Sequence, residues 1–220
     1  MSGSMSLFPM FLKLTGRKCV VVGAGTIAED KIISLLAAEA DITVIAPAVN
    51  NRVRELANSG RVSLIERSFV ASDLADAFLV IAATASTSVN REVFEEAQLR
   101  GVLCNAVDDP ENCDFYFPAV VRRGALQIAI STAGESPALA QHLRAEIEEQ
   151  LDTYTGDWLA KLGSVRREVL ATVPAGEERK RLLHTLSTRE ICDSAECPSR
   201  KLIANLQCLP QRVAEPAAKL

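Results

Sequence analysis

The stretch "KCVVVGAGTIA", residues 18–28, joins a β-branched run, two glycines and the start of a helical pattern. It matches the spacing G-x-G-x-x-A directly after an expected strand. In such a turn Gly23 permits the sharp change of direction, Gly25 lets the backbone approach a pyrophosphate, and Ala28 lets the helix pack closely on the strand. The free N–H groups at the start of the helix favour an anion. The stretch therefore predicts a dinucleotide site; a glycine turn made only for packing is the alternative.

The residues around this turn alternate between strand and helix patterns. We expect strands over 18–25, 41–47, 61–69, 78–84 and 102–108, and helices over 26–40, 50–60 and 88–101. In the first helix, Ile27, Ile32, Leu35 and Leu36 are expected on or near one face. The run 78–84 is almost entirely apolar, as in a strand covered by helices on both sides. This alternation predicts an α/β fold, a Rossmann-like, parallel, doubly wound sheet.

A different pattern begins after residue 112. The stretch "FYFPAVVRRGALQIAIS", residues 115–131, reads as two strands around Arg123-Gly124, which is a hairpin signal. Ser136 is expected to cap a helix that begins at Pro137, and the chain beyond residue 152 looks helical. We therefore expect three parts. They are an NAD-binding Rossmann domain over 5–112, a dimerisation hairpin and helix over 113–150, and a helical C-terminal domain over 151–220.

The composition limits the partners. The formal net charge is −4 and no long run of Lys and Arg occurs, so we expect no nucleic acid. No apolar run approaches the roughly 18–20 residues of a membrane span, and "LFPMFL" near the start follows no basic segment, so we expect neither a membrane span nor a signal peptide. Cysteines without an export signal favour a reduced, cytoplasmic protein. The spacing of Cys192, Cys197 and Cys208 fits no common metal pattern, and we assign no metal site.

The cofactor prediction has one missing part. A carboxylate that would hold the adenosine ribose should end the second strand, but that strand ends at Ile45-Ala46-Pro47. Ribose contacts must then come from backbone groups or elsewhere. We expect NAD, although Arg52 and Arg54 could meet the 2′-phosphate of NADP or simply lie on an exposed helix face. The expected cofactor-binding residues are Gly23, Gly25, Thr26, Ile27, Ala28, Pro47, Ala48 and Thr84.

Several stretches together resemble the precorrin-2 dehydrogenase module, which occurs alone or as the N-terminal part of siroheme synthase. They are "LFPMFLKLTGRKCVVVGAGTIAEDK" (residues 7–31), "TVIAP", "IAAT", "LCNAVDDP" and "FYFPAVVRRGALQIAISTAGESPALA". The resemblance implies NAD-dependent oxidation of precorrin-2 to sirohydrochlorin, ferrochelation to siroheme in some members, and a homodimer. The family usually has Arg-Lys where this chain has Asp30-Lys31, and a serine where this chain has Thr132.

Asp108 is the expected catalytic residue. It follows an apolar strand in "LCNAVDDPENCDF", residues 103–115, and ligands of such sheets bind beyond the carboxyl ends of the strands. The resemblance places the essential aspartate of the family here. From the residues alone, a turn or cap role for Asp108 or Asp109 is equally open. The substrate carries several carboxylates, and five arginines are candidates to meet them: Arg122, Arg123, Arg144, Arg166 and Arg167.

Two alternatives remain open from the sequence. The first is a nucleotide-sensing Rossmann regulatory module, which would share the glycine turn and need no catalytic aspartate. The second is a dehydrogenase of the same architecture with another substrate. For iron handling, histidine is the usual residue, but the chain has only His142 and His184, both in expected helices where a structural role is more common.

Overall fold

The computed structural model describes residues 7–188 and 197–207. The chain divides into two compact units, with the boundary between Phe117 and Pro118. The first unit contains a parallel sheet of five strands in the order β3-β2-β1-β4-β5. Its strands are β1 (Lys18–Val22), β2 (Asp41–Ile45), β3 (Ser63–Ile65), β4 (Leu79–Ala82) and β5 (Leu103–Ala106). Its helices are α1 (Thr26–Leu36), α2 (Asn51–Asn58) and α3 (Thr87–Arg100), with 3-10 turns η1 (Ala71–Leu74) and η2 (Pro110–Asn112).

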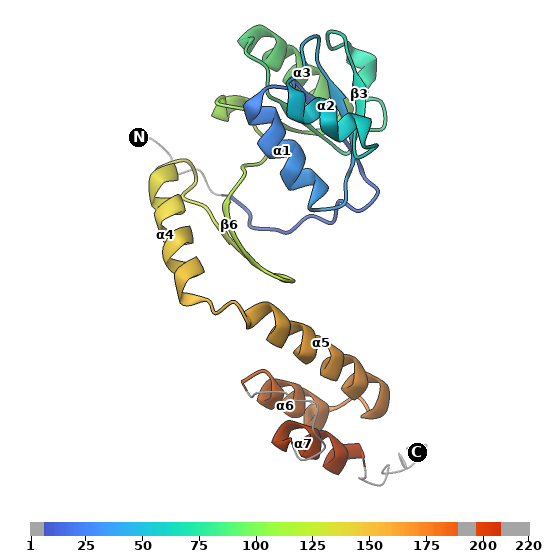
Figure 1. The fold of residues 1–220 in the computed structure, drawn as a ribbon, viewed down its shortest axis with the longest axis vertical. Helices are drawn as coiled ribbons and strands as arrows, with labels where there is room; N and C mark the ends of the chain where they lie inside the picture. The colour runs from blue at the N-terminus through green and yellow to red at the C-terminus, as the bar shows by residue number, and fades with distance from the viewer. Residues whose placement is uncertain (1–6, 189–196, 208–220) are drawn as a thin grey trace, which may run out of the picture. The chain divides into compact units, whose positions relative to one another are not determined.

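Both faces of this sheet are buried. Strand residues on one face pack with Ala28, Ile32 and Leu35 of α1 and with the apolar side of α2. The alternate strand residues face α3 and η1 on the other side, around Val93 and Ala97. The helices lie on both sides of the strands in Figure 1. This layering confirms the expected α/β Rossmann-like fold, because only a sheet covered on both faces has strands that are apolar at successive positions.

Local details differ from the sequence expectation at a few places. The predicted inward position of Ile27 is wrong, since its side chain is 49% exposed, while the smaller Ala28 is fully buried. The first helix ends at Leu36 rather than at residue 40. The turn that follows it includes Glu39, whose backbone is left-handed (φ 59°). The third strand is only Ser63–Ile65, because it pairs on one side alone, with β2.

The second unit begins with an antiparallel hairpin, β6 (Ala119–Arg123) and β7 (Leu126–Ile130). Helix α4 (Pro137–Gln150) follows, and the Ser136 side chain accepts a hydrogen bond from the Leu139 N–H at 3.2 Å, which confirms the predicted cap. A two-stranded hairpin is marginal alone. Here Ala119 and Val121 are buried, and α4 packs against β6.

Three further helices complete the second unit: α5 (Thr155–Thr172), α6 (Glu177–Leu186) and α7 (Pro198–Gln207). They enclose a small core that includes Val169, Leu186 and Ile203. The hairpin turn also contacts α5 closely. A Cβ at Gly124 (φ +57°) would lie 3.2 Å from the Cα of Gly156, so both positions favour glycine. The helical character expected beyond residue 152 is confirmed by these described helices.

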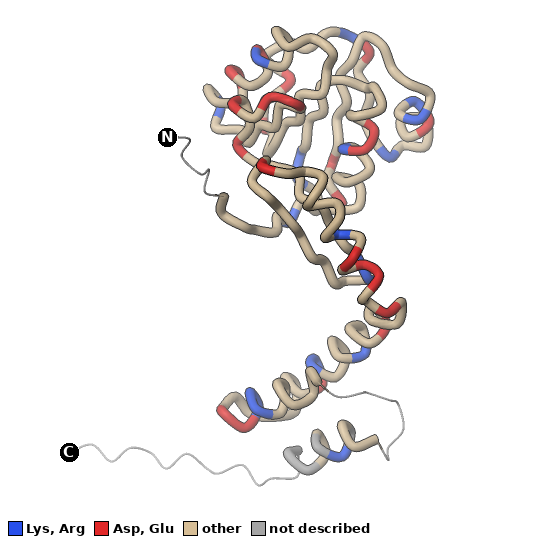
Figure 2. Tube along the Cα trace, turned by 90° about the vertical axis from the view of Figure 1, so that its left-hand side faces the viewer, with Lys and Arg blue, Asp and Glu red and all other residues tan. Residues whose placement is uncertain are grey.

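The surface carries both signs of charge. Figure 2 shows Lys and Arg interspersed with Asp and Glu along each unit. Mixed charges of this kind are typical of ordinary soluble surfaces. Within the described residues, none of the helices has both the length and the apolar character that crossing a bilayer requires.

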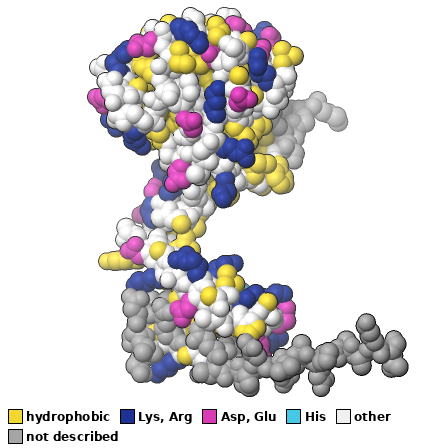
Figure 3. Space-filling model, turned by 90° about the vertical axis from the view of Figure 1, so that its right-hand side faces the viewer, with side chains coloured by type: hydrophobic (Ala, Val, Ile, Leu, Met, Phe, Trp, Pro, Cys, Tyr) yellow, Lys and Arg dark blue, Asp and Glu magenta, His cyan; other side chains and the backbone are white. Residues whose placement is uncertain are grey.

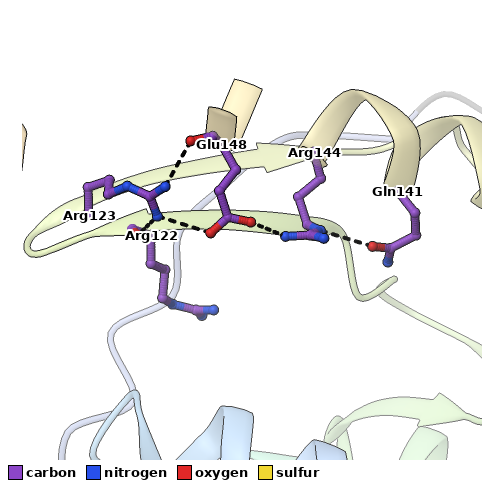
Figure 4. Close-up of polar contacts among 5 residues, drawn as sticks. All are labelled: Arg122, Arg123, Gln141, Arg144 and Glu148. Atoms are coloured by element: carbon purple, nitrogen blue, oxygen red, sulfur yellow. Dashed lines mark hydrogen bonds and ion pairs between the residues drawn. The ribbon is translucent and has the colours of Figure 1, made fainter. Parts of the chain in front are cut away.

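A charged network joins the hairpin to α4 (Figure 4). Arg123 donates to a Glu148 carboxylate oxygen at 3.0 Å and to the Glu148 carbonyl at 2.8 Å. Arg144 pairs with the same carboxylate and also donates to the Gln141 side chain at 3.1 Å. The Arg122 guanidinium points away from this group in Figure 4. Glu148 therefore neutralises two arginines at the point where the hairpin meets its helix.

Lowering the pH should weaken this network. The hydrogen bond from Arg123, followed by that from Arg144 and by both positive charges, holds the pKa of Glu148 below its ordinary value of 4.5, against the opposing effect of desolvation. A carboxylate with a depressed pKa stabilises the fold above its unfolded pKa and loses that contribution as the pH falls through the folded value. We expect wild type to melt above Glu148→Gln at pH 6, and the difference to shrink below about pH 4.

The control is Glu146→Gln on the same helix, where the ion-pair partner of the carboxylate in the described part of the chain is the exposed His142, at 3.2 Å. This change should alter the melting temperature little at either pH. Thermal melts followed by circular dichroism make the comparison. A constant gap between wild type and Glu148→Gln from pH 6 to pH 3.5 would contradict a role for the ionised carboxylate.

Candidate active site

The turn after β1 is shaped by a close backbone contact. Gly23 has φ +113°, and its N–H donates to the Ile45 carbonyl at 2.9 Å. A Cβ at Gly23 would lie 2.3 Å from the carbonyl oxygen of Ala83, just beyond β4. No side chain fits there, and a positive φ is unfavourable for most other residues. Glycine is thus required at this position by the neighbouring strand, whether or not a ligand binds.

Gly25, in contrast, faces open space. It is the N-cap residue of α1 with extended backbone (φ −86°, ψ −171°), and no protein atom lies within 4 Å of a Cβ built on it. Glycine has no side chain that could cap the helix. The N–H groups of Thr26 and Ile27 have no hydrogen-bond acceptor among the described residues. Open backbone at a helix N-terminus suits the pyrophosphate of a dinucleotide. The residues present therefore fit the pyrophosphate of a dinucleotide.

The loop after β2 is tied to this turn by Asn50, which the sequence analysis missed. The Asn50 N–H donates to the Ala24 carbonyl at 3.1 Å, and its side-chain amide donates to Glu29 at 2.9 Å. Its side-chain oxygen accepts from the Val53 N–H at 2.8 Å and so caps α2. An Asn immediately before the helix is an N-cap signal that could have indicated this role. Pro47 and Ala48 are exposed in the same loop.

The two arginines of α2 both have carboxylate partners. Arg52 donates to Glu55 at 2.9 Å. Arg54 makes a two-point contact with Glu66, at 2.8 and 2.7 Å. These exposed pairs contribute little to stability. They balance the positive charge of α2 locally, beside the loop that follows β2.

The loop after β4 is fixed by a buried amide. Asn90 on α3 is only 5% exposed. Its side-chain oxygen accepts from the Thr84 N–H at 3.1 Å and from the Thr84 hydroxyl at 2.7 Å, and its amide donates to the Thr84 carbonyl at 3.2 Å. The backbone N–H, the backbone carbonyl and the hydroxyl of Thr84 are therefore all hydrogen-bonded to Asn90. The sequence analysis named Thr84 but not Asn90, although a polar residue on the inward side of a helix was a signal for it.

Asp108 lies just beyond β5 and is exposed. Its backbone is left-handed, with φ 60°. Asp tolerates this conformation better than most residues, although non-glycine residues in it generally cost about 1–3 kcal/mol and cluster at functional sites. Within the described part of the chain, its carboxylate makes no hydrogen bond and no ion pair. Both oxygens are therefore available to a ligand.

The residues that flank Asp108 are held firmly. The Val107 N–H donates to the Ala82 carbonyl at 2.9 Å, which continues the pairing of β5 with β4. The Asp109 carboxylate accepts from the Asn112 side chain at 2.6 Å, so Asp109 belongs to the turn. The Cys113 thiol donates to the carbonyls of Ala106 and Asp109, at 3.1 and 3.2 Å.

The chain then returns along the edge of β5. Asp114 accepts from the Cys104 N–H at 2.8 Å and from the Gln98 side chain at 2.9 Å. Asn105 donates to the Phe115 carbonyl at 2.7 Å. These contacts explain why residues 113–117 belong to the first unit, a few residues beyond the boundary expected at 112. They also fix both ends of the turn that carries Asp108.

The cysteines near this turn are unreactive in character. Burial raises the pKa of Cys104 to about 12, with a smaller contribution from the charge of Asp114. Burial also raises the pKa of Cys113, against the effect of its hydrogen bond with Ala106. Thiols with raised pKa values stay protonated at neutral pH and are poor nucleophiles. They act here as small apolar residues and, at Cys113, as a hydrogen-bond donor.

No cluster of three or more His, Cys, Asp or Glu side chains suited to a metal ion occurs among the described residues. His142 lies on α4 and His184 on α6. Cys192 and Cys208 lie outside the part of the chain that the structure describes. Of the arginines considered for substrate carboxylates, Arg123 and Arg144 are taken up by Glu148, whereas Arg122, Arg166 and Arg167 are exposed.

The parallel sheet places the candidate residues along one edge. The Gly23–Gly25 turn, Thr84 and Asp108 follow the carboxyl ends of β1, β4 and β5, which are adjacent in the sheet. At a strand spacing of about 4.8 Å, the ends of β1 and β5 are roughly 10 Å apart. A cofactor held at the glycine turn and a substrate beside Asp108 would thus share this edge.

Comparisons with known proteins show which family this chain is similar to. A family model described as "Putative NAD(P)-binding" matches residues 10–119, and one described as "Sirohaem biosynthesis protein central" matches residues 123–150. Siroheme synthase 2 of Yersinia pseudotuberculosis is 38% identical over 186 residues, which are 84% of this chain and 39% of that protein. Siroheme synthase of Nitrosococcus oceani is 40% identical over 144 residues, which are 66% of this chain and 31% of that protein.

One solved structure resembles this chain over nearly the whole length of both chains. The structure titled "SirC, precorrin-2 dehydrogenase" superposes with a TM-score of 0.72 at 25% identity and covers 91% of this chain and 98% of that one. The chain described here spans only 39% of the Yersinia relative and 31% of the Nitrosococcus relative. The similarity to those siroheme synthases therefore concerns one part of each.

Replacing each glycine of the turn by alanine should give opposite outcomes. Gly23→Ala forces a Cβ against the Ala83 carbonyl at a positive φ, and we expect a loss of about 2–4 kcal/mol in the free energy of unfolding. Gly25→Ala places a methyl group in open space at a negative φ and should leave stability unchanged within about 1 kcal/mol. It should weaken NAD binding about tenfold or more, because the methyl group obstructs the pyrophosphate.

Urea unfolding and calorimetric NAD titration measure these two effects separately. Gly60→Ala is a control for glycine replacement, since it also has a positive φ (+70°) but no atom within 4 Å of its Cβ. Normal stability of Gly23→Ala would contradict the steric argument. Unchanged NAD affinity in Gly25→Ala would exclude this turn as the pyrophosphate site.

Proposed function

Because the chain belongs to the family of siroheme biosynthesis proteins that carry an NAD(P)-binding domain, we propose that it oxidises precorrin-2 to sirohydrochlorin with NAD. The observation that carries this proposal is the unbonded carboxylate of Asp108 at the same sheet edge as the open glycine turn. A solved precorrin-2 dehydrogenase that shares the fold over 98% of its length supports it.

The reaction removes two hydrogens from the macrocycle. One leaves as a hydride and the other as a proton, and the electrons left behind extend the conjugated system of the ring. When bound, the nicotinamide supplies the hydride acceptor. The protein must supply a base for the proton. Asp108 is our assignment for that base, because its two oxygens are exposed and have no partner among the described residues.

The turn around Asp108 suits this role. Its neighbours are fixed by Ala82, Asn112 and Cys113, so the carboxylate is held in place by contacts that do not use its own oxygens. A base positioned in advance saves the entropy of ordering it during the reaction. The hydrogen bond between Asp109 and Asn112 assigns the second carboxylate to the turn.

We propose NAD rather than NADP as the cofactor. The pairs Arg52–Glu55 and Arg54–Glu66 leave α2 without an unpaired arginine to meet a 2′-phosphate. A phosphate placed there would also approach the two glutamates, and like charges repel. The second strand ends without a carboxylate, so the ribose contact falls to backbone groups and to residues such as Pro47 and Ala48.

We also propose a homodimer in the cytoplasm. Apolar side chains in the segment before β1 are exposed, with Phe8 at 80% and Phe11 at 68%, and Figure 3 shows hydrophobic side chains gathered where this segment begins. Exposed apolar groups in sequence favour a protein partner. The hairpin β6–β7 remains our expected dimerisation element. The free thiols of Cys19, Cys104, Cys113 and Cys197 suit a reducing compartment.

Direct assays distinguish two other functions from the proposed one. Ferrochelation stays a prediction of the family resemblance, and ferrous ion with sirohydrochlorin would reveal it by a change in absorption. A nucleotide-sensing module would bind NAD without oxidising a substrate. The exposed Asp108 carboxylate in a left-handed turn favours catalysis over sensing, because strained, unbonded polar groups occur mainly at functional sites.

Asp108→Asn should abolish most of the activity while keeping the fold. Asn adopts the left-handed conformation at least as readily as Asp, so the melting temperature should not change. Loss of the base should reduce kcat by about 10²–10⁴-fold. The measurement is NADH formation from precorrin-2 under anaerobic conditions. Asp109→Asn is the control, because its amide oxygen can still accept from Asn112, and it should stay within about threefold of wild type.

Cofactor preference can be tested through Glu66. Wild type should use NAD at least about tenfold better than NADP, measured as kcat/KM. Glu66→Gln frees Arg54 and should narrow that ratio by about threefold or more. Glu92→Gln on the exposed side of α3 removes the same charge elsewhere and should leave the ratio unchanged. A wild-type preference for NADP would refute the assignment of NAD.

A further inference from the structure

Lys31 has an unusual environment on α1. It lies one turn beyond the start of the helix and is half-buried. Its ammonium nitrogen lies 4.0 Å from the centre of the Phe117 ring, and that ring packs against Phe115 with centroids 5.6 Å apart. Burial lowers the pKa of Lys31, while the negative charges of Asp30 and Asp108 oppose that effect. The ammonium group is therefore electrostatically coupled to the candidate base.

The ammonium group has no hydrogen-bond acceptor of its own. Among the described residues, Lys31 makes no hydrogen bond and no ion pair, and Asp108 interacts with it only at longer range. A lysine has three N–H donors, and removing a charge from water is unfavourable unless it is paired. The face of Phe117 offers a cation–π contact worth about 0.5–2 kcal/mol, which leaves all three donors unused.

Three other cations of this unit have hydrogen-bonded partners. Arg54 contacts Glu66 and Arg67 contacts Asp73, in both cases through two hydrogen bonds. Lys18 donates to the Ala75 carbonyl at 2.6 Å. Lys31 and Asp108 thus form an exception: two opposite charges close enough to interact, each without a bonded partner in the described residues.

We propose that Lys31 anchors a carboxylate of the tetrapyrrole substrate beside Asp108. This inference rests on the proposed function, since precorrin-2 is a macrocycle with several carboxylate side chains. A carboxylate would accept hydrogen bonds from the ammonium, and the apolar macrocycle would extend over the Phe115 and Phe117 rings, whose packing is fixed by the Asn105 contact to the Phe115 carbonyl. Lys31 would thereby place the reacting part of the ring next to the base.

A structural role for the lysine stem is separable from this role. The four-carbon stem can cover Phe117 without using its charge. Lys31→Met keeps a long apolar side chain and removes the ammonium, whereas Lys31→Arg keeps the positive charge. Arg61→Met is a matched control, because it removes one exposed positive charge between α2 and β3, at the amino end of the strands.

Binding and kinetics are measured on the full-length chain. Sirohydrochlorin titrations followed by absorption give Kd without turnover, and anaerobic assays with precorrin-2 and NAD give KM and kcat. We expect Lys31→Met to raise Kd and KM by about tenfold or more, with a smaller change in kcat. Lys31→Arg should stay within about threefold, Arg61→Met should match wild type, and the Kd for NAD should be unchanged in all variants.

Distinct outcomes overturn distinct claims. If wild type forms no NADH from precorrin-2, the proposed function fails, and this inference fails with it. If wild type is active but Lys31→Met binds sirohydrochlorin normally, only the role of Lys31 is overturned. A parallel loss of NAD affinity would assign Lys31 to the cofactor instead and would also overturn it. If Lys31→Met folds poorly, Lys31→Gln replaces it in the same measurements. Weaker sirohydrochlorin binding in Lys31→Gln but not in Lys31→Arg would then support the role of the positive charge, and normal binding in Lys31→Gln would overturn it.

Discussion

The close approach of Gly23 to the Ala83 carbonyl is the constraint on which the site depends. At 2.3 Å, the space for a Cβ is already occupied by backbone, so the β1–α1 turn rests directly on the end of β4. This contact fixes where α1 begins and hence where Gly25 and Lys31 lie. Because β4 lies between β1 and β5, it also relates the turn to the strand that precedes Asp108. One steric condition therefore positions both the glycine turn and Asp108, our candidate base.

Hydrogen bonds made by neutral side chains hold the loops of the candidate site. Asn50 connects the glycine turn to α2, Asn90 fixes Thr84, and Cys113 braces the turn that carries Asp108. Neutral donors and acceptors can be satisfied inside the protein at little electrostatic cost. The arrangement leaves the carboxylate of Asp108 and the ammonium of Lys31 free to interact with a substrate.

The sequence predicted the fold because its strongest signals are local. The G-x-G-x-x-A turn, the apolar run of β4 and the glycine stop of α3 each follow from a few adjacent residues, and the structure bears them out. Helix periodicity alone placed Ile27 inward, which was wrong, because the helix turns its small Ala28 toward the sheet. Local patterns could have indicated the cap formed by Asn50 and the inward position of Asn90, but not their partners Glu29 and Thr84, which lie 21 and 6 residues away.

The candidate site was predictable only where chemistry and topology coincide. A carboxylate after a buried parallel strand points to the ligand-binding edge, and this position together with the family resemblance is why Asp108 was named from the sequence. Nothing in the local sequence distinguishes Lys31 from a solvated helix lysine, because its environment arises from Phe117, a residue 86 positions away. A half-buried cation without a bonded partner is unfavourable unless a ligand compensates it. Lys31 has no hydrogen bond or ion pair among the described residues, whereas Arg54 is paired with Glu66, and this contrast is the observation behind our proposal that an anionic substrate binds at this edge.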